Sequence, residues 1–166
     1  MLTLGVHKKG LTVLAACALA AAGALASPVV SDRLSNPDVK CFAKDSLGRM
    51  WIGTERGLNR YNGYDFHQYF HSPDSLSIPD NRIYDLCADS LGRLWVGTED
   101  GVALYCPDDT FRRIPIDSEE RAVYQVLCDR EGRIILNMQE DICVYDSLSN
   151  SFVKAVPGFD RYFSYH

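Results

Sequence analysis

Two sets of polar side chains could bind a metal ion in this chain of 166 residues. His67 and His71 are four residues apart, a spacing that suits zinc on a helix. In an extended segment the same spacing separates them by about 13 Å. Asp74 and the pair Asp108-Asp109 could offer oxygen ligands to calcium, but they do not form the Asp-x-Asp-x-Asp-Gly loop of a dedicated site. We therefore expect loop histidines and solvated turn carboxylates, with no metal ion or other cofactor.

Two carboxylates at equivalent places in the sequence, Glu55 and Glu99, could form a catalytic acid–base pair. Each follows the same Gly-Thr dipeptide, so the pair belongs to a repeated segment, and repetition is typical of a structural residue. The chain shows no nucleophile elbow, phosphate-binding loop or dinucleotide fingerprint. We therefore predict no catalytic residues and no enzyme activity in this chain.

A run of aromatic residues starting at Tyr61 is the best candidate for contact with a ligand. Sugars stack on exposed aromatic rings and bond to nearby polar side chains. Tyr61 and Phe66 recur in each copy of the repeat described next, which assigns them to packing. Tyr64, Tyr69 and Phe70 remain as predicted ligand contacts.

The elements that would position these residues come from an internal repeat. Asp45–Gly57 and Asp89–Gly101 are identical at ten of thirteen positions, at an offset of 44 residues. A divergent third copy begins at Asp129, with Ile135 in place of tryptophan. A period of 40–45 residues indicates a repeat architecture. The predicted structural residues of the two good copies are Asp45, Gly48, Trp51, Gly53, Thr54, Gly57, Asp89, Gly92, Trp95, Gly97, Thr98 and Gly101.

Each copy reads as four short strands. The Asp-x-x-Gly segment is typical of a tight hairpin turn, and turn glycines recur every 8–12 residues, as in all-β proteins. Four strands per repeat is the spacing of β-propeller blades. The expected strands are 39–43, 50–54, 58–61 and from 66; 83–88, 94–98, 102–105 and from 111; and 123–128, 134–138, 142–145 and from 152.

Strand alternation predicts how the blades pack. Trp51 and Trp95 point to the opposite side of the sheet from the apolar residue that follows each of them. We expect one side to face the next blade and the other side to face the preceding one. Gly53 and Gly97 share the tryptophan side and would let a neighbouring sheet approach closely.

The pattern Asp-x-x-Gly-Arg-x-Trp-[IV]-Gly-Thr-x-x-Gly-[LV] resembles the two-component-regulator propeller repeat. The linker that runs from Ser75 through Asn81-Arg82-Ile83-Tyr84 into Asp89 is similar to that family too, and the resemblance covers residues 36 to about 153. It implies the periplasmic, oligosaccharide-sensing part of a hybrid two-component sensor. The kinase, further blades, downstream sensor domains and a homodimer contact would belong to a longer protein.

The predicted fold is therefore an incomplete β-propeller, with blades at 36–78, 79–118 and 119–156 after a short linker at 27–35. Residues 157–166 would start a further blade. Propellers close with about four to eight blades, so three leave sheet faces uncovered. Two alternatives stay open: a fragment of a propeller enzyme such as a lyase or hydrolase, and a structural scaffold that does not signal.

The N-terminal segment predicts export. Residues 1–26 combine a basic start with an apolar stretch too short to span a bilayer, and Ala24-Leu25-Ala26 offers a signal peptidase site. Leu14-Ala15-Ala16-Cys17 also fits a lipoprotein signal, which leaves lipid anchoring as an alternative. The net charge is −5, and it becomes −7 without this segment. An acidic chain without basic clusters argues against nucleic acid and anionic lipid as partners.

Cysteine usage points to packing. Besides Cys17 the chain has five cysteines, an odd number, and none of them forms a Cys-x-x-Cys metal pattern. We expect small strand residues in the interior of the protein, with one disulfide left open as an alternative. These cysteines are Cys41, Cys87, Cys106, Cys128 and Cys143.

Overall fold

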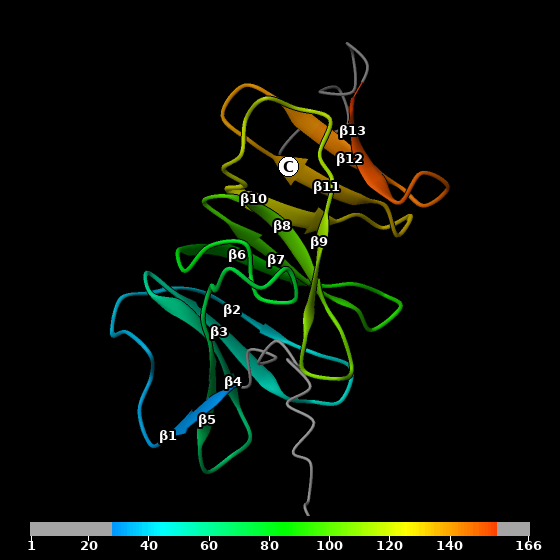
Figure 1. Cartoon of the computed structure of the whole chain (residues 1–166). Helices are drawn as coiled ribbons and strands as arrows, with labels where there is room; N and C mark the ends of the chain where they lie inside the picture. The colour runs from blue at the N-terminus through cyan, green and yellow to red at the C-terminus, as the bar shows by residue number, and fades with distance from the viewer. Residues whose placement is uncertain (1–27, 156–166) are drawn as a thin grey trace, which may run out of the picture.

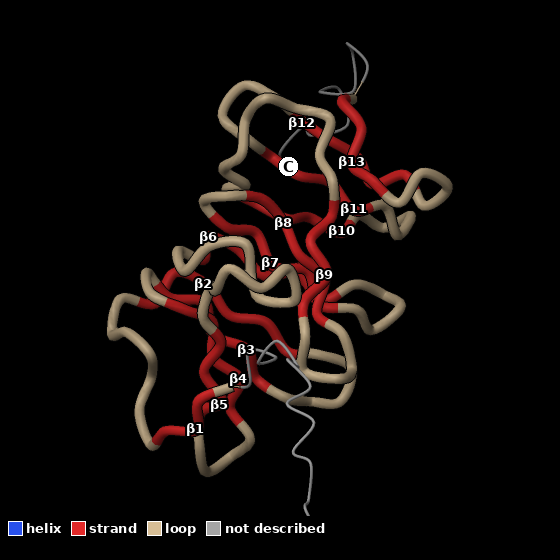
Figure 2. The backbone as a smooth tube through the Cα atoms, viewed as in Figure 1, coloured by secondary structure: helices blue, strands red, loops and turns tan. Residues whose placement is uncertain are grey.

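The computed structural model describes residues 28–155 (Figure 1). Within that range thirteen strands form three antiparallel sheets, and no helix occurs (Figure 2). None of the described residues forms a helix able to cross a bilayer. The predicted signal at 1–26, the lipid attachment site at Cys17 and the expected further blade at 157–166 lie outside the described residues.

The first sheet has five strands in the order β1-β5-β4-β3-β2, and the other two have four strands each in sequence order. The strands of the first sheet are β1 Val29–Ser31, β2 Val39–Lys44, β3 Met50–Thr54, β4 Gly57–Tyr61 and β5 Phe66–Tyr69. The second sheet holds β6 Ile83–Ala88, β7 Leu94–Thr98, β8 Gly101–Tyr105 and β9 Phe111–Ile114. The third holds β10 Gln125–Cys128, β11 Ile134–Asn137, β12 Ile142–Asp146 and β13 Ser151–Lys154.

The three sheets follow one another in chain order and lie face against face, as propeller blades do (Figure 1). The first strands of successive sheets, β2, β6 and β10, contact one another and form the inner edge. The predicted all-β, incomplete propeller of four-stranded units is confirmed. The divergent third copy also forms a sheet, because its turn aspartate and its apolar alternation survive the loss of the tryptophan.

The repeated aspartate builds the first hairpin of each blade. In the second blade, Asp89 Oδ1 accepts hydrogen bonds from the backbone N–H of Leu91 and Arg93 at 3.0 and 2.9 Å. Gly92 takes the left-handed conformation at φ +77°, which an L side chain adopts only with strain. The chain therefore reverses direction here and passes from β6 to β7.

Apolar side chains between successive sheets form the core. Trp51 packs toward the second blade with Ile83 and Val96, whereas Trp95 packs toward the third blade with Leu136 and Phe152. The prediction that the tryptophan and the residue after it face opposite neighbouring blades is confirmed for Trp95 and Val96, since Trp95 packs toward the third blade and Val96 toward the first. Two aromatic rings lie against each indole. Trp95 lies 5.0 Å from Tyr145 and 5.6 Å from Phe152 of the third blade between ring centroids. Trp51 lies 4.6 Å from Tyr105 of the second blade and 5.6 Å from Tyr69 of its own blade.

The linker expected at 27–35 differs in the structure. Val29–Ser31 form strand β1, which pairs antiparallel with β5 and adds an outer edge to the first blade. The chain then returns across one side of this blade, where the Ser35 backbone N–H donates to Asn59 Oδ1 at 2.8 Å. The sequence of this segment carries no repeat signal, so its pairing with a strand over thirty residues away could not be anticipated.

The blades have two different ends, which we name for use below. The Asp-turn face carries the hairpin turns between β2 and β3, β6 and β7, and β10 and β11. The link face carries the turns between β3 and β4 and between β7 and β8, together with the connections 70–82 and 115–124 between blades. The five described cysteines are free thiols. Cys143 is buried and the other four are half-buried.

Candidate ligand-binding face

The three predicted ligand contacts do not converge on one site. Tyr64 lies in the turn between β4 and β5 on the Asp-turn face and is 88% exposed. Phe70 follows β5 at the opposite end of that strand and is 38% exposed. Tyr69 lies between them in the sequence, but it is only 3% exposed. A ligand could not touch all three.

Tyr69 is a correction to the sequence prediction, because it belongs to the core between the first two blades. Its ring lies 5.6 Å from Trp51 and 5.3 Å from Phe111 between centroids. Its hydroxyl donates to Asp109 Oδ1 at 3.0 Å. Burial raises the pKa of Tyr69, so the phenol stays neutral and serves as a structural donor.

On the link face, charged side chains join the first two blades along the inner edge. Arg82 Nε donates to Glu55 Oε1 at 2.6 Å, and Arg82 Nη1 donates to Glu99 Oε2 at 3.2 Å. Lys40 Nζ lies 3.4 Å from Glu55 Oε2. Both repeated glutamates are therefore paired with cations, and Arg82 bridges them rather than leaving a carboxylate pair free for acid–base work.

Two tyrosines continue this edge toward the third blade. Tyr84 lies near the start of β6, Tyr124 directly precedes β10, and their ring centroids are 5.0 Å apart. The Tyr84 hydroxyl donates to Glu99, and this hydrogen bond raises the pKa of Tyr84. Tyr124 is exposed. The inner edge thus presents aromatic surface beside oriented donors and acceptors, a combination typical of sites for polar ligands.

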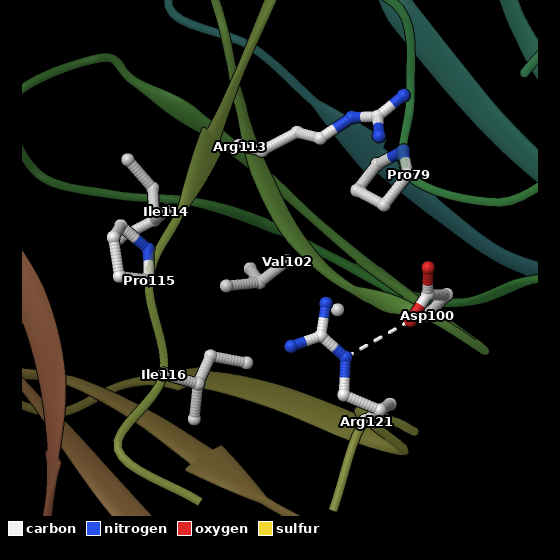
Figure 3. A pocket seen from close by; sticks show the side chains of 9 residues that line it. Pro79, Asp100, Val102, Arg113, Ile114, Pro115, Ile116 and Arg121 are labelled. Atoms are coloured by element: carbon white, nitrogen blue, oxygen red, sulfur yellow. Dashed lines mark hydrogen bonds and ion pairs between the residues drawn. The ribbon is translucent and has the colours of Figure 1, made fainter. Parts of the chain in front are cut away.

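The adjoining part of the link face holds a pocket of about 210 Å³ (Figure 3). Its walls are mainly aliphatic, and two arginines and one aspartate border it. Arg121 Nε donates to Asp100 Oδ1 at 3.0 Å, and both side chains are more than half exposed. Asp100 follows Glu99 in the sequence, so the pocket adjoins the inner edge. The lining residues are Pro79, Asp100, Gly101, Val102, Arg113, Ile114, Pro115, Ile116 and Arg121.

The second arginine at the pocket is held by the connection between the first two blades. Arg113 Nη2 donates to the carbonyl oxygens of Asp74 and Ile78 at 3.2 and 3.4 Å and to Ser77 Oγ at 3.1 Å. These bonds fasten the connection onto β9. Arg113 therefore acts mainly as a wall of the pocket, and Arg121 is the exposed polar group at its mouth.

The remaining sequence candidates do not assemble into a metal site. Within residues 28–155, no group of three histidine, cysteine or acidic side chains is placed to hold a metal ion. His71 Nδ1 lies 3.1 Å from the Ile78 carbonyl oxygen, while His67 lies within β5. Asp109 accepts hydrogen bonds from Arg60, Tyr69 and Tyr105 between the blades and is thus committed to the structure.

Sequence reasoning missed Asp100, Arg121 and the pocket. Two signals pointed there. The only polar difference among the thirteen matched repeat positions is Arg56 against Asp100. The residue after the fourth strand is Phe70 in the first blade and Pro115 in the second. Both differences fall at the pocket, where the second blade departs from the first.

Comparison with protein families matches this chain to the two component regulator propeller, over residues 33–56 and 77–100. Each match spans the first strand, the Asp turn and the second strand of a blade. A histidine kinase from Formosa agariphila is 42% identical over 48 residues, which are 28% of this chain and 4% of that protein. The chain therefore spans a small part of its curated relative.

Solved structures share the fold at low sequence identity. The extracellular domains of two hybrid two-component systems from B. thetaiotaomicron match with TM-scores of 0.66 and 0.63 at 20% identity. The matches cover 75% and 70% of this chain but only 20% and 16% of those domains. A virginiamycin B lyase from Staphylococcus aureus matches with a TM-score of 0.58 at 12% identity, over 76% of this chain and 44% of the lyase. These likenesses show the propeller fold.

Proposed function

Since this chain carries two copies of the two-component regulator propeller repeat on a propeller fold, we propose that it is the periplasmic ligand-sensing part of a hybrid two-component sensor. The observation that carries the proposal is the repeat itself, which matches twice and in register. Solved propellers of similar fold come from extracellular domains of such systems, and the signal sequence predicted at 1–26 agrees with export.

We assign ligand binding to the link face, and the ligand class to oligosaccharides. The exposed ring of Tyr124 beside Tyr84 offers an apolar platform, and the bridged pair Glu55–Arg82–Glu99 offers fixed donors and acceptors. A sugar ring has apolar C–H surface on its faces and hydroxyls around its edge, so it complements such a surface. The link between ligand binding and phosphotransfer would run through a kinase in a longer protein, and a homodimer contact would belong there too.

Isothermal titration calorimetry of the exported protein against a panel of oligosaccharides tests this assignment. We expect saturable binding of at least one panel member, weakened by about tenfold in the double variant Y84A/Y124A because two stacking surfaces are lost. Tyr64→Ala is the matched control, since that ring is exposed on the opposite face. No binding by any panel member, or equal loss in both variants, would contradict the assignment.

The propeller lyase alternative predicts chemistry as well as binding. Acid–base catalysis needs a group free to exchange a proton with substrate. The two repeated carboxylates, Glu55 and Glu99, both lie in ion pairs with Arg82. We therefore favour a binding role, and we expect bound oligosaccharides to be recovered unchanged by mass spectrometry after long incubation.

Sequencing the gene beyond the codon for His166 tests the wider assignment: an open frame with more repeats, a membrane helix and kinase motifs is expected.

A further inference from the structure

The first two blades can be compared position by position on the link face, because both are copies of the same repeat. Gly57 and Gly101 begin the third strand in their blades and share a left-handed backbone, at φ +107° and +110°. Leu58 pairs with Tyr69 in the first blade, and Val102 pairs with Ile114 in the second. The next residues, Phe70 and Pro115, are therefore structural equivalents.

In the first blade, the ring of Phe70 fills the space over Gly57. A side-chain carbon added at Gly57 would lie 2.9 Å from Cε1 of Phe70 and 3.0 Å from its Cδ1. The Phe70 ring thus lies against this glycine. In the second blade nothing lies within 4 Å of a carbon added at Gly101. The pocket of about 210 Å³ lined by Gly101 and Pro115 occupies this space.

The geometry points to a subsite in the second blade that accepts one six-membered ring in the place that Phe70 fills in the first. The pocket is small, equal to the share of roughly seven water molecules in liquid water. It is below the usual range of about 300–1,000 Å³ for sites that enclose a whole drug-sized ligand. One ring of a longer ligand would enter, and the rest would extend along the link face.

The walls and the mouth of the pocket select the chemistry of that ring. Val102, Ile114 and Ile116 offer aliphatic surface on one side (Figure 3). The Arg113 guanidinium is bound to the connection between the first two blades. At the mouth, Arg121 and Asp100 form an exposed pair that together carries no net charge and presents both donors and acceptors. Hydroxyl groups can use both. The chain as a whole has a net charge of −5, which disfavours an anionic ligand.

We therefore assign the pocket to a neutral pyranose ring, an assignment that rests on the proposed oligosaccharide function. The ring would lie over Gly101, with its C–H face on the aliphatic wall and its hydroxyls toward Arg121 and Asp100. Pro115 is what keeps the space open.

The test fills the pocket with the residue that the first blade already uses. Pro115 contributes its carbonyl oxygen to the fold, accepting from the Phe152 N–H at 2.8 Å, and any residue retains that group. Pro115→Phe should keep the melting temperature of the wild type and weaken binding of the best neutral oligosaccharide by about tenfold or more. Pro115→Ala leaves the space open, so it should bind the same oligosaccharide more tightly than Pro115→Phe does. Tyr64→Ala, on the Asp-turn face, is the control and should bind like the wild type. Arg121→Ala should weaken binding without filling the pocket.

A second readout separates this assignment from the function on which it rests. The panel contains neutral gluco-, manno-, galacto- and xylo-oligosaccharides together with oligouronates, and NMR follows the Gly101 and Val102 amides during titration. We expect both amides to shift with a neutral member. Binding that leaves them unshifted, that survives Pro115→Phe, or that prefers oligouronates overturns the subsite while oligosaccharide recognition stands. No binding by any member overturns both.

Discussion

At the scale of single residues, the turn aspartate does more than shape a hairpin. Asp89 is almost fully buried, and its Oδ2 accepts hydrogen bonds from Arg93 Nε at 2.6 Å and from Trp95 Nε1 at 2.9 Å. It thereby satisfies the one polar atom of the indole that packs against the next blade. Burial opposes ionisation of Asp89, but the hydrogen bonds from Trp95 and Arg93 outweigh it and lower the pKa of this carboxyl.

Asp89→Asn should therefore destabilise the protein by about 1–3 kcal/mol at pH 7, because it weakens a buried charge-assisted network. The native pKa lies below the unfolded value of about 3.9, so this stabilisation is present above that value and is lost as the pH falls through the native pKa. Urea unfolding of wild type and variant between pH 7 and pH 3 should show the gap closing below about pH 4.

The matched control is Asp129→Asn in the third blade. Asp129 Oδ2 accepts a hydrogen bond from Arg133 Nε at 2.6 Å in the same way, but Ile135 replaces the tryptophan here and has no side-chain N–H. Asp129 is also more exposed than Asp89. The loss should be smaller than for Asp89→Asn. Equal losses would mean that the bond to the indole contributes nothing measurable.

At the scale of packed elements, the two interfaces between blades differ in the charge of one pair of equivalent side chains. Between the first and second blades, Arg60 of β4 pairs with Asp109 in the turn before β9. Leu104 and Asn150 hold the equivalent places between the second and third blades, and both Asp109 and Asn150 adopt a left-handed backbone. At these two equivalent positions, one interface carries a complete ion pair and the other carries no charge.

This comparison predicts strong coupling between Arg60 and Asp109. Asp109→Asn should cost about 1–3 kcal/mol, because it leaves the Arg60 guanidinium, which is 10% exposed, without its carboxylate. Arg60→Leu should cost less, since Asp109 is partly exposed and keeps the Tyr69 and Tyr105 hydroxyls as donors. The double variant should lie within about 1 kcal/mol of the wild type in urea unfolding. Additive losses would show that the two side chains act independently.

Trp95 tests the contact between the second and third blades. Trp95→Ala removes a fully buried indole and should cost about 3–5 kcal/mol, which corresponds to a fall of the melting temperature by about 10 °C or more. Leu91→Ala, in the adjoining turn and 75% exposed, is the control and should leave the melting temperature nearly unchanged. A Trp95→Ala melting curve like that of the wild type would remove this residue from the interface.

At the scale of the whole molecule, the arc of three blades ends in sheet faces without a neighbour among residues 28–155. Phe42 in the first blade is equivalent to Leu86 in the second, and Leu86 packs against the first blade. Phe42 is 73% exposed. Val39 lies on the same inner strand and Leu127 lies on the third blade, and both are exposed. Exposed apolar surface of this kind promotes association.

The isolated chain should consequently associate as its concentration rises. Sedimentation velocity should show a shift toward larger species that Phe42→Ser, combined with Leu127→Ser, reduces by removing apolar contact area. Tyr64→Ser on the Asp-turn face, which removes an exposed ring away from the sheet faces, is the control and should leave the association unchanged. Monomer at all concentrations would show that other surfaces shield these faces.

The sequence by itself determined the features that depend on short separations along the chain. A turn aspartate that bonds its own backbone, a left-handed glycine and strict alternation along each strand act within a few residues of one another. They sufficed to place strands β2 to β13 to within about two residues at each end, to group them into three sheets, and to orient Trp95 and Val96 on opposite sides. These preferences are local, and the same residues occur in more than one copy of the repeat.

Only the tertiary structure decided the features that depend on distant partners. The burial of Tyr69 depends on Phe111 of the next blade, which packs against its ring. The sequence of β1 has no strand signal, and this strand is defined by its pairing with β5. The pocket exists because Pro115 stands where Phe70 would have filled the space over the glycine. Burial on a sheet depends on what packs against it, and that neighbour lies tens of residues away along the chain.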